Sequence, residues 1–208
     1  DMRAVLRAGA DKVSINTAAI KRPDLIREAS RVFGSSTIVV SIEAMKRSDG
    51  IYEAYIDYGR EQTGVDACTW AVRAVELGAG ELVVTSINRE GTGEGYDLEL
   101  TRRIAEAVDV PVIASGGAGQ VGHIYDVIAR GKADAVSMAS VLHYNFLMHH
   151  RSGEQEFSGE GNIEFLKGRS GAKAFSKIQD ISLPEIKEYL THHCIECLPA
   201  RVRSPDGF

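Results

Sequence analysis

The sequence has few of the features that mark secreted, membrane-bound or nucleic-acid-binding proteins. Its three cysteines are a small and odd number, which argues against a disulfide framework. The net charge of -5 argues against nucleic acid or an anionic membrane as the main partner. No apolar run approaches the ~20 residues of a membrane span, and no charged and then apolar leader opens the chain. We therefore expect a cytoplasmic protein.

What is present is a regular alternation of strand-like and helix-like segments. The strands are expected at 12–16, 37–42, 81–86, 110–115 and 133–139, with amphipathic stretches between them. Polar and apolar residues alternate over 52–58, as they do in one half of a β-hairpin. Residues 149–181 are polar and show no periodicity, which indicates an insertion. A last helix is expected at 183–193. Strands that alternate with helices predict a parallel sheet, either closed in a barrel or open and doubly wound.

An internal repeat favours the barrel. The segment ADKVS at 10–14 recurs as ADAVS at 133–137, 123 residues later, which is close to half of the ~250 residues of a (β/α)8 barrel. The two copies would then be four strands apart in a ring of eight. We expect residues 1–208 to form a single partial TIM-barrel domain of about five strands, lacking the first three βα units and carrying the insertion at 149–181.

Glycines and small residues follow the strands where a barrel holds its ligand. The stretch VPVIASGGAG at 110–119 predicts a buried strand that ends in Ser115, Gly116 and Gly117, whose amides can approach an anion. Ala139 and Ser140, at the start of a helix, complete a phosphate cradle of the kind found after the last two strands of such barrels. By the repeat, Asn16 and Thr17 form a second cradle opposite. Two cradles suit a substrate with a phosphate at each end.

One carboxylate stands out between these cradles. Glu43 follows a buried strand, where partial desolvation can raise its pKa into the range useful for acid–base catalysis. The alternative is an ion pair with Lys46 or Arg47. Further polar and glycine residues at the end of the next strand either bind substrate hydroxyls or order their own loop: Thr85, Asn88, Glu90, Gly91 and Thr92.

Other conspicuous residues have structural explanations. Lys12 and Glu81 both open strands, at the end of a barrel where charges form stabilising ion pairs. Trp70, in an amphipathic helix, predicts a core contact. The segment HHCIEC at 192–197 invites a zinc or redox interpretation but lacks a second ligand pair, so we expect the end of the last helix there, with no metal and no cofactor.

At these residues the chain resembles a known family, the cyclase subunit of imidazole glycerol phosphate synthase, a lyase of histidine biosynthesis. The resemblance is carried by AGADKVSINTAA (8–19), LGAGELVVTSINREGTGEGYDLELTR (77–102), VPVIASGGAG (110–119) and ADAVSMASVLHY (133–144). It implies a (β/α)8 barrel that takes ammonia from a glutaminase, as its heterodimer partner, and adds it to a bis-phosphorylated ribulosyl-formimino aminoimidazole carboxamide ribonucleotide (PRFAR). The products are imidazole glycerol phosphate and aminoimidazole carboxamide ribonucleotide (AICAR).

The resemblance also implies roles for residues. Glu43 stands where the family has its general acid, and both cradles bind substrate phosphates. Lys12 and Glu81 become part of a charged ring that gates ammonia, and Asp11 faces the partner subunit.

The chain departs from the family pattern in the same region. Glu43 replaces an aspartate, Asn88 and Glu90 replace two more, and the insertion is additional. The family's second catalytic aspartate belongs to a first strand that lies outside this sequence. These departures leave two alternatives open: a paralogue that uses ammonia in amidino-sugar biosynthesis, and a phosphate-binding scaffold without catalysis.

Overall fold

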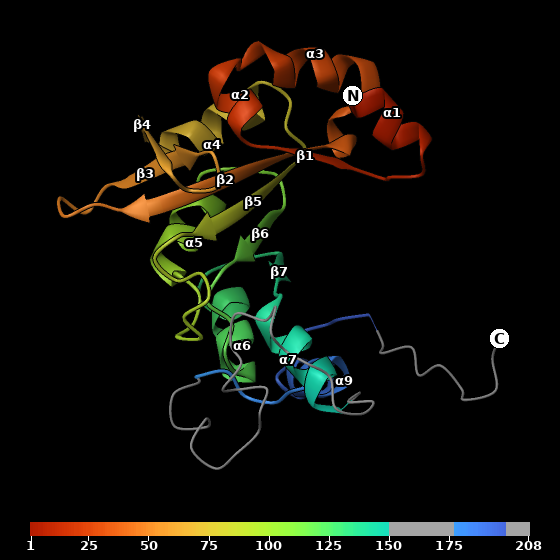
Figure 1. The fold of residues 1–208 in the computed structure, drawn as a ribbon, viewed down its shortest axis with the longest axis vertical. Helices are drawn as coiled ribbons and strands as arrows, with labels where there is room; N and C mark the ends of the chain where they lie inside the picture. Colours follow the sequence, from red (N-terminus) through yellow and green to blue (C-terminus); the bar gives the residue numbers. More distant parts are fainter. Residues whose placement is uncertain (150–176, 199–208) are drawn as a thin grey trace, which may run out of the picture.

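The computed structural model describes residues 1–149 and 177–198. Its centre is a sheet in which five parallel strands lie side by side in chain order: β1 (Val13–Ile15), β2 (Ile38–Lys46), β5 (Glu81–Ser86), β6 (Val112–Ser115) and β7 (Ala135–Ser137). An antiparallel hairpin, β3 (Tyr52–Ile56) and β4 (Glu61–Asp66), extends the carboxyl half of β2. Figure 1 shows that the units follow one another through the molecule in the order of the sequence.

Helices connect the strands, and several begin at capping side chains. Asp66, Asp97 and Ser182 each accept a hydrogen bond from a backbone N–H in the first turn of the helix that follows, as N-caps do. None of the described helices combines the length and apolar character needed to cross a bilayer. The helical segments are α1 (Met2–Arg7), α2 (Thr17–Lys21), α3 (Asp24–Phe33), the 3-10 turn η1 (Ser35–Thr37), α4 (Ala67–Glu76), α5 (Leu98–Ala105), α6 (Val121–Ala129), α7 (Ser140–His149) and α9 (Leu183–His192).

The two faces of the parallel sheet differ in burial. Side chains alternate between the faces along each strand, and one face packs under the helices. Its residues are fully buried or nearly so: Ile38, Val40, Ile42, Leu82, Val84, Val112 and Ala114. Trp70 of α4 packs into the same cluster, which confirms the predicted core contact. The opposite face carries Ser41, Val83 and Ser115, which are only partly buried, together with Val39 and Thr85, which are 5% and 9% exposed.

The five predicted parallel strands are present, with three differences. β2 continues to Lys46, so the expectation that the strand ends before Glu43 was wrong; pairing with β3 keeps the segment extended although it lacks β-branched residues. β4 was not expected, because Glu61–Asp66 is a polar edge strand with little apolar alternation. The short helix α2 was also missed.

The repeat fits the topology. The two ADxVS copies supply β1 and β7, which lie four positions apart among the parallel strands. In the ranges 1–149 and 177–198 the sheet is open and does not close on itself. Most of the insertion expected at 149–181 lies outside the described residues. The last helix, α9, begins at Leu183, its predicted start, with Ser182 as its N-cap.

Candidate functional site

A row of polar residues crosses the uncovered face of the sheet. The strand registers pair Glu43 with Thr85, Thr85 with Ser115, and Ser115 with Ser137. Partners in adjacent parallel strands point to the same side. Glu43 therefore faces away from the helices, in line with two hydroxyls at the ends of β5 and β6.

The carboxyl of Glu43 is half-buried and only partly compensated. Burial raises its pKa above the usual range, and the like charge of Glu90 adds to the rise, while the backbone amide of Gly59 and the side chain of Asn16 oppose it. Its Oε2 is shielded from solvent and has no hydrogen-bond partner among the described residues. A buried acceptor without a donor is uncommon and typical of a binding or catalytic site.

The alternative interpretation of Glu43 as a plain ion pair is not supported. The ammonium of Lys46 contacts Glu99 at 2.5 Å, and the guanidinium of Arg47 lies 3.0 Å from Asp49. Both cations that follow Glu43 in the sequence are therefore paired with other carboxylates.

A cavity of about 170 Å³ opens beside this row, at the carboxyl ends of β6 and β7. Gly116 and Gly117 have φ values of 88° and 110°, which L-side chains rarely adopt. A Cβ on Gly117 would overlap the carbonyl of Gly95, so the close approach of the two backbones requires glycine there. The lining brings together all five residues expected in the first phosphate cradle, which are Ser115, Gly116, Gly117, Ala139 and Ser140. The other residues of the lining are Glu90, Gly91, Ala118, Ser137 and Met138.

The residues expected in the second cradle lie outside the lining of this cavity. The Oδ1 of Asn16 is buried and without a partner among the described residues, and the side chain of Asn16 lies close enough to Glu43 to lower its pKa. The hydroxyl of Thr17 accepts a hydrogen bond from the backbone N–H of Asp57, at 3.1 Å. Thr17 is thus already bonded to the turn between β3 and β4, a contact that the sequence did not suggest.

Two loop residues expected near the substrate have internal partners. Asn88 Oδ1 accepts a hydrogen bond from the backbone N–H of Lys46 at 3.0 Å. Thr92 donates its hydroxyl hydrogen to the carbonyl of Arg89 at 2.7 Å. Both side chains therefore order the loop after β5 and its junction with β2.

At the opposite end of the sheet, Lys12 and Glu81 form a salt bridge. The Glu81 side chain is 14% exposed and that of Lys12 is 47% exposed, so the pair is open on the lysine side. Asp11 precedes Lys12 and is exposed.

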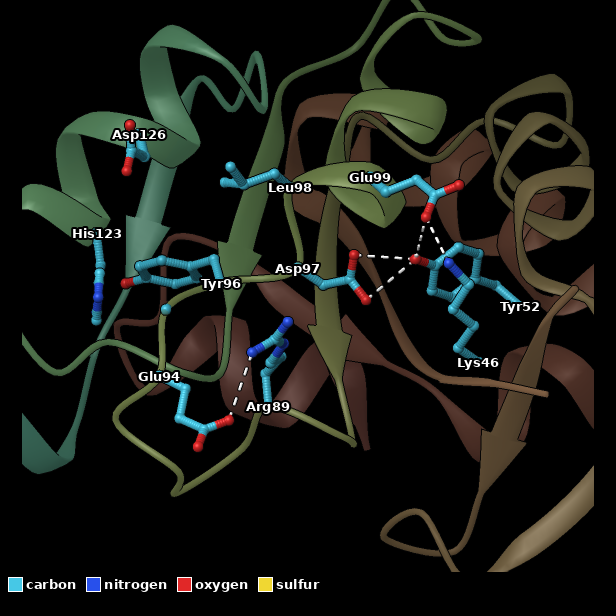
Figure 2. Close-up of a pocket in the computed structure, with 11 residues that line it drawn as sticks. Lys46, Tyr52, Arg89, Glu94, Tyr96, Asp97, Leu98, Glu99, His123 and Asp126 are labelled. Carbon is cyan, nitrogen blue, oxygen red and sulfur yellow. Dashed lines mark hydrogen bonds and ion pairs between the residues drawn. The ribbon is translucent and has the colours of Figure 1, made fainter. Parts of the chain in front are cut away.

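A second cavity, of about 500 Å³, lies beside the ends of β2 and β5 and the starts of α5 and α6 (Figure 2). The Tyr52 hydroxyl donates to the carboxylate of Asp97 at 3.0 Å and lies 3.3 Å from Glu99. Burial, followed by these two carboxylates, raises the pKa of Tyr52. Two cations of the lining are paired with its carboxylates, Lys46 with Glu99 and Arg89 with Glu94, whereas Asp126 pairs with Arg130 outside the lining. Neither Tyr52 nor Asp97 was among the site residues expected from the sequence.

Among residues 1–149 and 177–198, no group of three or more histidine, cysteine, aspartate or glutamate residues is placed to hold a metal ion. In the 192–197 segment, His193 stacks on Tyr189 with ring centroids 4.0 Å apart, and the Cys197 thiol lies 3.6 Å from the carbonyl of Lys187. These residues pack against α9.

Comparison with known proteins gives consistent matches. Residues 1–147 match the model of a family described as "Histidine biosynthesis protein". Three relatives carry the name "Imidazole glycerol phosphate synthase subunit HisF", and the word subunit implies that they act with a partner. Those from Alkaliphilus metalliredigens and Methanocaldococcus jannaschii are both 51% identical, over 70% and 69% of this chain. The one from Trichormus variabilis is 55% identical over 71% of this chain.

The chain spans 58% to 60% of the length of these relatives. The family fold is a (β/α)8 barrel, and the five parallel strands of this sheet follow one another as barrel strands do. The chain belongs to the histidine biosynthesis protein family.

Proposed function

We propose that this chain carries out the cyclase reaction of imidazole glycerol phosphate synthase. Ammonia is added to the bis-phosphorylated PRFAR, which yields imidazole glycerol phosphate and AICAR. The observation that carries the proposal is the placement of Glu43: a half-buried carboxyl with raised pKa and an unpartnered oxygen, in register with Thr85 and Ser115. The relatives' names support the same reaction.

In this proposal Glu43 is the general acid. A raised pKa keeps its carboxyl protonated to higher pH, so that it can give a proton to a leaving oxygen or nitrogen of the substrate. Thr85 and Ser115 stand beside it and offer hydroxyls to the chain of atoms between the two phosphates. Glu90 contributes a like charge that favours the protonated form of Glu43.

The phosphates are assigned to the two ends of this row. One occupies the 170 Å³ cavity, where the backbone amides at Gly116, Gly117 and Ser140 meet the start of α7. The other is assigned to Asn16 and Thr17, at the start of α2, and Gly91 and Asn88 belong to the loop between them.

We further propose that ammonia comes from a glutaminase subunit bound at the amino-terminal ends of the strands. The salt bridge between Lys12 and Glu81 lies at that end, between β1 and β5, and its exposed lysine can move to admit a small molecule. Asp11 would face the glutaminase. The cytoplasmic location stays a prediction.

Replacement of Glu43 by glutamine in the full-length protein tests the assignment. We expect kcat for PRFAR with ammonium salt to fall by at least ~100-fold, since glutamine keeps the shape but has no proton to give, while substrate binding changes by only a few-fold. Glu61→Gln, on the exposed edge strand β4, is the matched control and should leave turnover unchanged. Loss of binding in Glu43→Gln would make Glu43 a structural residue.

Two further measurements separate the alternatives. Growth of a histidine auxotroph that carries the gene would exclude an amidino-sugar paralogue, which the relatives' names do not favour. Calorimetry with PRFAR and ammonium salt addresses the scaffold, which would bind the ligand and release no imidazole product.

A further inference from the structure

The turn between β3 and β4 has an unusual backbone. Three successive residues, Asp57, Tyr58 and Gly59, have φ values of 51°, 58° and 72°, in the left-handed region. For the two residues that carry a Cβ, this conformation costs about 1 kcal/mol or more each. Such a turn persists only where its surroundings hold it.

Burial of the turn's own side chain does not hold it, because Tyr58 is 85% exposed. The contacts come instead from the backbone on either side of Tyr58. The N–H of Asp57 donates to Thr17 Oγ1 at 3.1 Å. On the other side, a Cβ built on Gly59 would lie 3.2 Å from Ile87 Cδ1 and 3.9 Å from Glu43 Oε2. The turn therefore spans from the end of β1 to the carboxyl of Glu43.

We propose that this turn is a positioning element for Glu43 and that it acts through Gly59, whose missing Cβ lets the backbone lie against the carboxyl. The inference rests on the proposed function, in which Glu43 transfers a proton. The Thr17 hydroxyl, which accepts from Asp57, still has its own hydrogen to donate to a phosphate. The second phosphate cradle and the carboxyl of Glu43 are thus held by the same turn.

The electrostatics agree with this geometry. The Gly59 amide lowers the pKa of Glu43, against the larger effect of burial and together with the side chain of Asn16. The other titratable group that acts on Glu43 is Glu90, on the loop after β5, and it raises the pKa. Displacement of Gly59 removes a stabilising contact of the carboxylate, so the pKa of Glu43 should rise.

The chain offers a matched pair of glycines for the test. Gly59 and Gly64 lie on the same hairpin with φ values of 72° and 71°, so alanine pays the same backbone strain at both. Only at position 59 does the new methyl group meet a neighbour, Ile87; at position 64 nothing lies within 4 Å. In the full-length protein, a carbon-detected NMR titration follows the Glu43 carboxyl, and steady-state kinetics follow kcat and KM.

We expect Gly59→Ala to raise the pKa of Glu43 and to lower kcat about tenfold, with KM within about twofold. The new methyl group would displace the carboxyl by a few tenths of an ångström from the position it needs for proton transfer. Gly64→Ala should lose similar stability and change neither quantity. The double variant Gly59→Ala/Ile87→Ala, which makes room for the methyl group, should return both towards wild type, and it serves as the test if Gly59→Ala does not fold.

Equal titration curves in the two single variants would overturn the inference, as would a fall in the Glu43 pKa or a double variant that stays displaced. If wild type turns over PRFAR and Gly59→Ala matches Gly64→Ala, the positioning role fails and the cyclase function stands. If wild type is inactive and the pKa change is specific to position 59, the turn positions Glu43 and the cyclase function fails.

Discussion

The two faces of the sheet are built from alternate residues of the same strands and have opposite properties. On β2, Ile42 is fully buried under the helices, whereas its neighbour Glu43 faces the open side. On β6, Ala114 is buried and Ser115 lines a cavity. One face supplies the apolar contacts that stabilise the fold. The other carries polar groups in register across four strands.

Because neighbouring residues of a strand face opposite sides of the sheet, a residue that stabilises the fold is followed directly by one that faces the candidate site. The helix-covered face has no polar side chain to satisfy in the middle of β2 and β5, so it can hold the strands rigidly. Rigid strands fix the spacing of Glu43, Thr85 and Ser115 on the other face. A site built on strands in this way needs little ordering when a ligand arrives.

The largest expected effect is at Gly117, which belongs to the candidate site and yet tolerates substitution as poorly as a core residue does. Gly117→Ala forces a side chain into a left-handed backbone and against the carbonyl of Gly95. We expect a loss of about 3 kcal/mol of unfolding free energy in urea, with weaker binding of inorganic phosphate. Gly122→Ala in α6, with open space around its Cβ, is the control and should be neutral or gain up to about 1 kcal/mol. Equal stability of the two variants would contradict the assigned backbone contact.

A pair of adjacent valines sharpens the comparison directly. Val84 is 1% exposed under the helices, and Val83 is partly exposed on the other face of β5. Val84→Ala should cost about 2 kcal/mol, from the lost apolar contacts and the cavity left behind, and Val83→Ala clearly less. Urea unfolding of both variants measures the difference. Similar losses would mean that both faces are covered in solution.

Much of the framework was predictable because it depends on local sequence. Continuous β-branched runs such as residues 37–42 and 81–86 mark strands of a parallel sheet, and the Gly116–Gly117 pair marks a loop that lines the cavity beside them. The pairing of Lys12 with Glu81 also followed from their places at strand starts. The repeat predicted that β1 and β7 lie four positions apart among the parallel strands.

The rest depended on contacts between distant segments. β4 has no apolar alternation of its own and is extended because it pairs with β3. For Asn88 the sequence left open whether the side chain binds substrate or orders its loop, and its Oδ1 accepts a hydrogen bond from the backbone N–H of Lys46, 42 residues away. The contact of Asp57 with Thr17 likewise joins a hairpin turn to the end of β1. No local pattern records which loop will fold over which strand end.

The smallest expected effect is the loss of folding stability that comes from the ionised carboxyl of Glu43. Because the folded state raises the pKa of this carboxyl, wild type is favoured at pH values below about 4, where Glu43 is protonated in both states, and loses stability as the pH rises through the raised pKa. Glu43→Gln has no such loss, so its melting temperature should exceed that of wild type at pH 7, by at most a few degrees, and the gain should shrink towards pH 4. Thermal melts of both proteins at several pH values measure this. A gain that is the same at pH 4 and pH 7 would mean that folding does not raise the pKa of Glu43, and that the charged carboxyl is as stable on this face of the sheet as it is in water.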